Sequence, residues 1–273
     1  MPSPNEIAVA QLVRLIGLPD APTLLDVRTD EQFASDPRVI PASLRGDHRT
    51  VATWAADHAG QRVVVACEDG LKLSQGVAAW LRQAGAAAES LEGGVAAWRT
   101  AGALLLDTRK LPPRDASGRT VWVTRARPKV DRIACPWLIR RFVDPHAVFL
   151  FVTASEVPDV AERFNATPFD IEGVFWSHRG ETCTFDTMLD EFGLDTPALR
   201  QLASIVRGAD TARPELAPEA AGLLAASVGY SRMYKDDLAQ LDAACSMYDA
   251  FYRRCRDASD ETHNWPAPKP APQ

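Results

Sequence analysis

A cysteine at the end of an apolar run is the clearest candidate nucleophile in this chain. In the stretch VVVACEDGLKLSQGVAAWLRQAG, which begins at Val63, four apolar residues lead to Cys67, and a short polar loop then leads into a helical pattern. Backbone N–H groups in such a turn converge, and the positive end of the following helix adds to them, so the loop would favour a thiolate or a persulfide. Glu68 and Asp69 oppose this effect, because neighbouring carboxylates disfavour a charged sulfur.

The loop suggests two catalytic roles and the lining of an anion site. Cys67 would be the nucleophile and sulfur carrier, and Lys72 would be the local cation. Gly70 permits the positive φ that a tight ring of amides needs. The residues between the two catalytic positions would line the substrate site: Glu68, Asp69, Gly70 and Leu71. The alternative interpretation of Cys67 is a buried structural cysteine at the end of a strand.

Arginines in the second half of the chain could bind an oxyanion, because a guanidinium group pairs with two oxygens at once. Arg132 and Arg207 are the candidates for an inward-facing position. Each has an acid nearby in the sequence that could orient it, Asp131 in the first case and Asp210 in the second. These arginines are therefore predicted to contribute to a substrate-binding site.

A third group contains residue types that bind transition metals. His178, Cys183 and Asp186 follow one another with the spacing His-x4-Cys-x2-Asp, which is not a closed zinc pattern. The alternative is a loop histidine and a half-buried cysteine without a metal. The sequence therefore indicates no certain cofactor and leaves open a divalent metal in the second half of the chain.

Composition and charge exclude several classes of partner. The chain has 273 residues, a net charge of −6 and a pI of about 5.4, so a nucleic-acid-binding surface is not expected. Its apolar runs are too short to span a bilayer, and the first residues show no basic leader followed by an apolar core. Five cysteines without tight spacing are typical of a protein of the reducing cytoplasm.

The first third of the chain alternates strand-like and helix-like segments. Thr23–Val27 and Arg62–Cys67 are apolar runs, and helical patterns follow them from Thr29 and from Ser74. This alternation predicts an α/β domain with a parallel sheet and helices on both faces. The segment 108–120 contains two prolines and a glycine and is predicted to be a linker. The expected divisions are a first domain over 1–107, this linker, a second domain over 121–257 and a disordered proline-rich tail over 258–273.

The second domain is predicted to be mixed α/β and rich in helices. The expected strands are 121–124 and 147–153, and Asp131–Asp144 is expected to be a helix with Pro136 near its start or kinking it. The further helices are expected over 157–164, 198–208, 219–228 and 237–255.

The first domain resembles the rhodanese-like sulfurtransferases. The phrases LLDVRTDEQF, VIPASLRG, CEDGLKLSQGVAAWLRQAG and LEGGVAAWRTAGALLL occur in the family's order and spacing over about 7–106. The resemblance implies a persulfide on Cys67 within a cradle of main-chain amides. The family's loop is C-R-x-G-x-R followed by serine or threonine, whereas this chain has Glu68, Lys72 and Leu73 at the differing positions. Transfer of sulfur from thiosulfate is therefore expected to be weak.

The second domain resembles the C-terminal domain of the chromate-resistance (ChrB-like) family. The phrases DRIACPWLIRRFVDP, ATPFDIEGVFWSHRGETCTFD, IVRGADT and DDLAQLDAACSMYDAFY carry this resemblance over about 121–255. It implies a role in chromate resistance, as a sensor or as an accessory protein. Family members proposed as transcriptional regulators carry a different N-terminal region, so DNA binding is not expected in this chain.

Two functions remain as hypotheses. In the first, a cytoplasmic stress-response protein couples sulfur transfer or thiol redox chemistry at Cys67 to the sensing of an oxyanion such as chromate or sulfate. A sulfur donor or a thiol acceptor would then be its partner. In the second, the rhodanese-like domain is a binding module, and the second domain responds to chromate or to a metal without catalysis. The sequence leaves open whether the protein forms a homo-oligomer.

Overall fold

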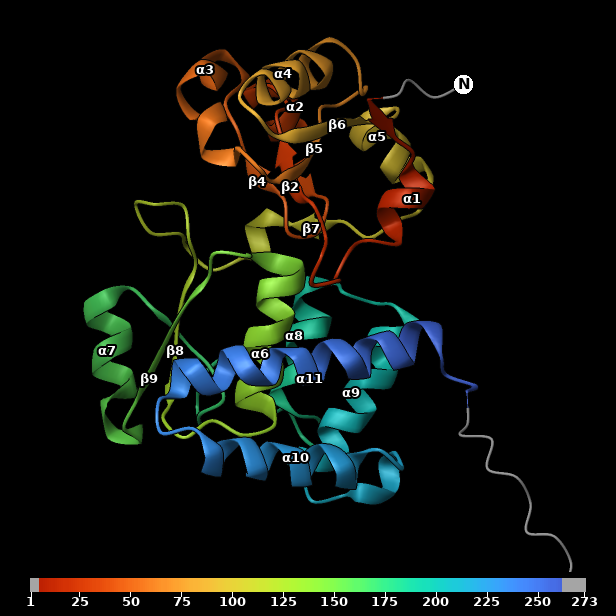
Figure 1. Cartoon of the computed structure of the whole chain (residues 1–273). Coiled ribbons are helices and arrows are strands. Elements are labelled where there is room, and N and C mark those ends of the chain that lie inside the picture. Colours follow the sequence, from red (N-terminus) through yellow and green to blue (C-terminus); the bar gives the residue numbers. More distant parts are fainter. Residues whose placement is uncertain (1–4, 262–273) are drawn as a thin grey trace, which may run out of the picture.

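The structure is a computed structural model that describes residues 5–261. It has two α/β domains, one above the other in Figure 1, with the N-terminal domain in red to yellow and the C-terminal domain in green to blue. Most of the tail that was predicted to be disordered lies outside the described residues. No helix among the described residues is long and apolar enough to cross a membrane.

The N-terminal domain is built on a five-stranded sheet in which every neighbouring pair of strands is parallel. Its strands are β1 (Glu6–Ile7), β6 (Ala87–Leu91), β5 (Arg62–Ala66), β2 (Thr23–Asp26) and β4 (Leu44–Arg45), in that order across the sheet. Its helices are α1 (Val9–Val13), α2 (Asp30–Ser35), α3 (Val51–Trp54), α4 (Lys72–Gln83) and α5 (Gly94–Thr100). Short 3₁₀ turns occupy His48–Thr50 and Ala55–His58.

Both faces of this sheet are covered, as the alternating pattern predicts. Successive side chains of β5 point to opposite faces. Val64 therefore packs in the apolar cluster that also holds Leu12 and Val95, from α1 and α5. Val65 packs in the other cluster, with Val77 of α4. The predicted fold class is confirmed, and α4 begins two residues before the predicted start at Ser74.

The C-terminal domain has a small parallel sheet surrounded by helices. The strand order is β10 (Thr167–Pro168), β8 (Val121–Arg125) and β9 (Val148–Val152). The helices are α6 (Asp131–Leu138), α7 (Val157–Phe164), α8 (Thr184–Phe192), α9 (Pro197–Asp210), α10 (Ala220–Met233) and α11 (Asp237–Asp257). Ile139–Val143 forms a π-helical turn after α6, and short 3₁₀ turns occupy Ala154–Glu156 and Pro214–Leu216.

Local chemistry explains where several helices begin. The hydroxyl group of Thr29 accepts the N–H of Gln32 at the start of α2, over 3.2 Å. Thr196 does the same for Leu199 at the start of α9, also over 3.2 Å. Such side chains satisfy N–H groups that the first turn of a helix leaves without a partner. Pro136 lies inside α6 and has no N–H to donate, and the helix changes to the wider π turn three residues later.

The segment predicted to be a linker is anchored to both domains. It follows β7 (Leu106–Asp107), which pairs with β3 (Arg38–Val39), and it begins with a 3₁₀ turn over Thr108–Lys110. Arg114 pairs with the buried Asp144 of the second domain over 3.3 Å. The Ala42 N–H also donates to the Phe142 carbonyl over 2.7 Å, which joins the two domains directly.

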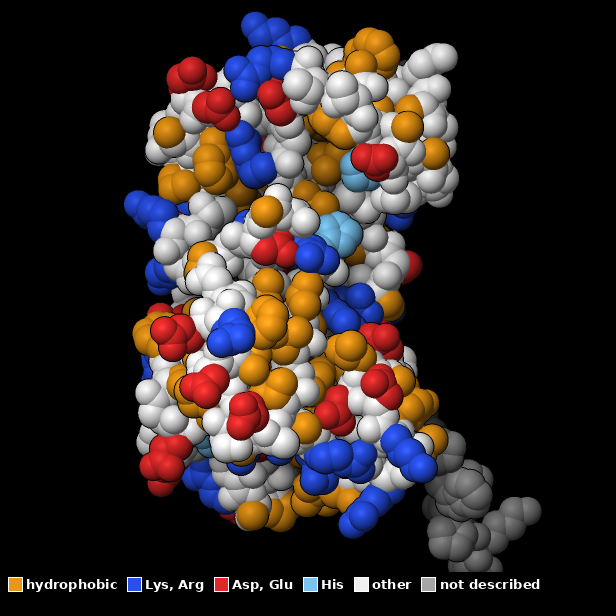
Figure 2. Space-filling model, turned by 90° about the vertical axis from the view of Figure 1, so that its left-hand side faces the viewer, with side chains coloured by type: hydrophobic (Ala, Val, Ile, Leu, Met, Phe, Trp, Pro, Cys, Tyr) orange, Lys and Arg blue, Asp and Glu red, His pale blue; other side chains and the backbone are white. Residues whose placement is uncertain are grey.

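A groove of about 860 Å³ runs along this junction, and its lining includes Trp54, His58, Pro113 and His146. Figure 2 shows the waist between the domains, with histidine side chains near it. Positive and negative side chains are interspersed over this face.

A pair of glycine substitutions tests how tightly the Cys67 loop is packed. Gly94 has a φ of +60°, and a Cβ there would lie 2.3 Å from the Cys67 carbonyl oxygen. Gly102 has a similar φ of +66°, but a Cβ there would meet nothing within 4 Å. We expect Gly94→Ala to lower the free energy of unfolding by about 3 kcal/mol or more, and Gly102→Ala by only about 1 kcal/mol. Urea denaturation measures both, and equal losses would show that the loop is not close-packed.

Candidate functional site

Cys67 lies directly after β5, at the end of the sheet where α4 begins. Its residue is 1% exposed and belongs to the apolar cluster on the α4 side of the sheet. The sulfur lies 3.3 Å from Oδ1 of Asp69 and 3.2 Å from Oγ of Ser74. Within residues 5–261, no backbone N–H donates a hydrogen bond to this sulfur. The thiol is thus positioned to donate a hydrogen bond to the Asp69 carboxylate.

The charges of the loop agree with this geometry. The Leu71 N–H and the Cys67 thiol both donate to Asp69, and these hydrogen bonds lower the pKa of that carboxyl group. The ionised Asp69 carboxylate is therefore a strong hydrogen-bond acceptor for the thiol. Glu68 lies 3.2 Å from Arg99 and 3.9 Å from Arg28, so its charge is paired within the domain.

The other predicted residues of the loop lie around the cysteine. Gly70 has a φ of +72°, and a Cβ there would lie 2.6 Å from the amide nitrogens of Gly93 and Gly94. Leu71 is 56% exposed, and Lys72 at the start of α4 is exposed. Gly70 is therefore needed for the close packing of this loop against the start of α5.

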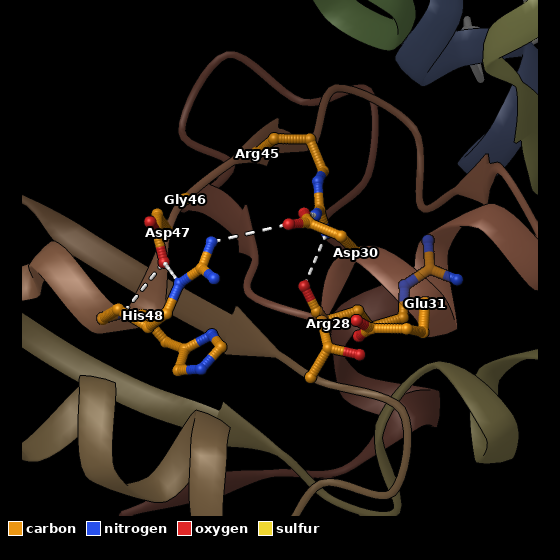
Figure 3. A pocket seen from close by; sticks show the side chains of 9 residues that line it. Arg28, Asp30, Glu31, Arg45, Gly46, Asp47 and His48 are labelled. Carbon is orange, nitrogen blue, oxygen red and sulfur yellow. Dashed lines mark hydrogen bonds and ion pairs between the residues drawn. The ribbon is translucent and has the colours of Figure 1, made fainter.

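A small pocket of about 400 Å³ opens beside β2 and β4 (Figure 3). Arg28, Arg45 and Arg49 line it, but each is paired with a carboxylate. Arg28 lies 2.6 Å from the buried Asp26, and Arg49 lies 3.4 Å from Asp30. The positive charge in this pocket is therefore neutralised by the domain itself.

In the C-terminal domain, three carboxylates surround one histidine. His178 Nε2 lies 3.3 Å from Asp170 Oδ1, 3.2 Å from Asp210 Oδ2 and 3.6 Å from Asp131 Oδ2. One ligand atom from each of Asp131, Asp170 and His178 lies within 4.8 Å of the others. We call the four residues Asp131, Asp170, His178 and Asp210 the aspartate–histidine cluster. The ligand atoms of Asp131, Asp170 and His178 are close enough to surround a single metal ion.

Three separate segments bring this cluster together. Asp131 is the first residue of α6, Asp210 is the last residue of α9, and Asp170 and His178 lie in the loop between β10 and α8. Asp131 is fully buried and accepts the N–H groups of Thr184 and Phe185 over 2.6 and 3.2 Å. It thus caps α8, whose positive end favours the carboxylate.

Further contacts fix the orientation of Asp170. The Thr184 hydroxyl donates to its Oδ1 over 2.9 Å, and Arg132 Nε lies 3.2 Å from its Oδ2. Arg125 approaches the same oxygen at 3.5 Å. The histidine is the cluster member open to solvent, because its side chain is 39% exposed whereas those of Asp131 and Asp170 are 0% and 7% exposed.

The backbone around the cluster is strained. Val130 has a φ of +40° and Asp170 a φ of +51°, a region that a β-branched residue such as valine rarely adopts. The surrounding helices enforce this conformation at Val130: its N–H donates to the Ser227 hydroxyl over 2.8 Å, and its carbonyl accepts the Tyr248 hydroxyl over 2.7 Å. Such strain costs about 1–3 kcal/mol per residue and is concentrated at functional sites.

A proton on His178 offsets part of the negative charge of the cluster. Hydrogen bonds to Asp170 and Asp210 raise the pKa of His178 to about 10. Burial, together with the charge of Asp210, raises the pKa of Asp131. Burial acts in the same direction on Asp170, but hydrogen bonds from His178 and Thr184 and the charge of Arg132 lower its pKa overall. The imidazolium therefore occupies the position from which a cation would neutralise the carboxylates.

The structure separates the residues that the sequence had grouped as metal ligands. His178 belongs to the cluster, whereas Cys183 and Asp186 contact each other at the start of α8. The Cys183 N–H donates to Asp186 over 3.0 Å, and Arg207 pairs with Asp186 over 2.9 Å. Arg132 pairs with Asp170 instead, so the two arginines predicted to bind an oxyanion form ion pairs with different carboxylates. From the sequence, Asp131 and Asp210 were expected only to orient arginines. Asp131 begins one predicted helix and Asp210 lies two residues after another, and this position at helix ends was their only signal.

Comparisons with known proteins agree with this architecture. Residues 8–101 match the rhodanese-like domain, and residues 122–255 match the C-terminal domain of ChrB. Protein ChrB of Cupriavidus metallidurans is 37% identical over 147 residues, which are 52% of this chain and 43% of that protein. The chain thus matches less than half the length of this curated relative.

Solved structures match the N-terminal domain. A rhodanese-related protein from Thermoplasma volcanium is 23% identical, with a TM-score of 0.33, over 37% of this chain and 97% of that chain. A rhodanese-like domain protein from Staphylococcus aureus is 27% identical, with a TM-score of 0.31, over 34% of this chain and 90% of that chain.

The chain is a two-domain protein in which a rhodanese-like domain comes first. Its second half is similar to the C-terminal domain of ChrB over residues 122–255. Both resemblances that the sequence suggested are confirmed.

The burial of Cys67 predicts slow alkylation in the native protein. All five natural cysteines are buried, so a Ser117→Cys substitution in an exposed loop provides an internal reference. We expect iodoacetamide to modify Cys67 roughly 100-fold more slowly than the engineered thiol, because the loop must open first. Peptide mass spectrometry measures both rates. Comparable rates would show that the thiol is accessible and reactive in the native state.

The proton on His178 predicts a pH-dependent contribution to stability. Because folding raises the pKa of His178 from 6.5 to about 10, its stabilising effect is complete below pH 6.5 and is lost as the pH rises through 10. The free energy of unfolding of the wild type should exceed that of His178→Gln at pH 6, and this difference should shrink by about 1–2 kcal/mol by pH 10.5. The expected value is small because solvent screens the half-exposed side chain. Urea denaturation in EDTA measures it. The exposed His146→Gln is the control, and an equal pH effect there would contradict the assignment.

Proposed function

We propose that this protein is a non-catalytic, metal-responsive regulator in the setting of chromate resistance. Its ChrB C-terminal domain binds a divalent transition-metal ion, and its rhodanese-like domain serves as a binding module. The observation that supports this proposal best is the convergence of Asp131, Asp170 and His178, whose ligand atoms lie within 4.8 Å of one another. Carboxylate oxygen and imidazole nitrogen are ligands that zinc and related divalent ions accept.

The charge of the cluster favours a cation over an oxyanion. Three carboxylates face His178, and the nearby Arg132 already pairs with Asp170. Chromate and sulfate carry two negative charges, so the carboxylates would repel them. A metal ion would instead replace the histidine proton and neutralise the same carboxylates. The metal-responsive form of the second hypothesis is therefore preferred to oxyanion sensing at this site.

The geometry at Cys67 supports the role of a binding module for the first domain. The Cys67 thiol is buried and donates its hydrogen bond to Asp69, whereas a reactive cysteine needs an accessible sulfur in an electropositive environment. Glu68, which occupies the position of an arginine in the family's loop, adds a negative charge beside it. Sulfurtransferase activity with thiosulfate should therefore be weak, and a persulfide on Cys67 would require the loop to open. The five buried free cysteines fit a stress-response protein of the reducing cytoplasm.

Titration calorimetry of the full chain with Zn²⁺ tests the metal site. We expect one ion per chain with a dissociation constant that is roughly micromolar or tighter. Asp170→Asn should weaken binding at least about tenfold, because it removes a charged ligand next to the ion. Titration with sodium sulfate or chromate should give no binding heat at this site.

Cys183→Ser is the matched control, because Cys183 is buried near the cluster but contacts Asp186 rather than His178. This variant should bind Zn²⁺ as the wild type does. If Cys183→Ser abolishes binding and Asp170→Asn does not, the ligands are those grouped by sequence spacing. If the wild type binds sulfate or chromate but no metal, the proposed function is wrong.

A further inference from the structure

The exposed apolar side chains of this protein are concentrated around one helix. Ten large hydrophobic side chains in the described chain are exposed, and five of them lie between residues 216 and 238. These five are Leu216 (38%), Leu224 (41%), Val228 (40%), Met233 (72%) and Leu238 (46%). An apolar concentration of this kind on a polar surface marks an interaction site.

The two sides of α10 differ in what they contact. The inner side carries Leu223, Ser227 and Ser231, which are buried against the rest of the domain, where α10 packs on α9 and α11. The outer side carries Leu224 and Val228, one helical turn apart, together with small residues. In Figure 1 this helix forms the lower edge of the molecule, with no element below it. We call the exposed side of α10 the outer α10 face.

The small residues of the outer α10 face would allow another helix to approach closely. They are Ala221, Gly222 and Ala225, and all three are exposed. No charged residue occurs on α10 before Arg232 near its C-terminal end. Two helices packed through such small side chains reach the shorter end of the usual interaxial range of about 8–10 Å.

The charges at the two ends of the outer α10 face are complementary and unpaired. Arg232 and Lys235 are exposed at the C-terminal end, and Glu215 is exposed in the turn before the N-terminal end. None of the three has an ion-pair partner among residues 5–261. Arg232 follows Leu224 and Val228 at intervals of four residues, so it extends the same side of the helix.

We propose that the outer α10 face binds a second copy of this chain. In an antiparallel arrangement about a two-fold axis, Leu224 and Val228 of the two copies pack against each other. The same arrangement brings Arg232 of each copy towards Glu215 of the other, so each end of the contact gains an ion pair. A two-fold contact must be complementary to itself, and this face meets that requirement through its apolar centre and its opposite charges at the two ends.

The contact is small, since one helix and its flanking turns supply it. Such an interface lies below the area of a stable complex, so the dimer forms reversibly and in the micromolar range. The inner side of α10 contacts the strained turn before Asp131 through Ser227. The proposed contact between the two copies does not depend on a metal, so it can be tested with the metal removed.

Sedimentation equilibrium of the full chain in EDTA, between about 5 and 300 µM, tests the proposal. The wild type should change with concentration from the 29.8 kDa monomer towards twice that mass. Leu224→Glu should weaken association at least about tenfold. Phe164→Glu, which places the same charge on another exposed apolar position, should leave it unchanged. Circular dichroism confirms that each variant is folded.

Charge reversal supplies the second measurement. Arg232→Glu and Glu215→Arg should each weaken the dimer, and the double variant should recover most of the affinity. A wild type that stays monomeric up to 300 µM would overturn the proposal, as would a dimer that Leu224→Glu does not affect. A chain that associates only when shortened to end at Glu261 would also overturn it, because its own tail would then cover the face. Because EDTA is present throughout, failure here leaves the metal proposal standing.

Discussion

The buried carboxylate of Asp131 is the constraint on which the C-terminal domain depends. It is fully buried, and it joins the start of α6 to the start of α8 by accepting two backbone N–H groups. Burying a carboxylate is costly unless hydrogen bonds and opposite charge compensate it. The N-terminal end of α8 and the protonated His178 provide that compensation. Helices α10 and α11 enforce the strained turn at Val130 that places the carboxylate there.

Carboxylates determine the chemistry of both domains, with opposite consequences. In the C-terminal domain three of them gather around His178 and create a demand for positive charge. In the rhodanese-like domain Asp69 accepts a hydrogen bond from the Cys67 thiol and places a negative charge beside the sulfur. The fold retains the loop and the glycines of a rhodanese-like domain, while its charged residues favour a buried, neutral sulfur.

Local features were predictable from the sequence, whereas the cluster was not. The parallel sheet follows from the alternation of apolar runs and helical patterns, and the helix Val157–Phe164 was predicted with the bounds that the structure shows. The helix predicted over Asp131–Asp144 instead ends at Leu138 and becomes a π turn, because periodicity does not report the missing N–H of Pro136. Asp131 and Asp210 are brought together by long-range packing of α6, α8 and α9, and sequence spacing could not reveal that contact.

Anomalous X-ray diffraction at the zinc absorption edge, from crystals grown with Zn²⁺, tests the central claim most directly. The account predicts one strong peak per chain, about 2.0–2.2 Å from a carboxylate oxygen of Asp131, a carboxylate oxygen of Asp170 and a ring nitrogen of His178. A peak at Cys183 and Asp186 instead, or an aspartate–histidine cluster that keeps its hydrogen bonds with no peak beside it, would contradict the account.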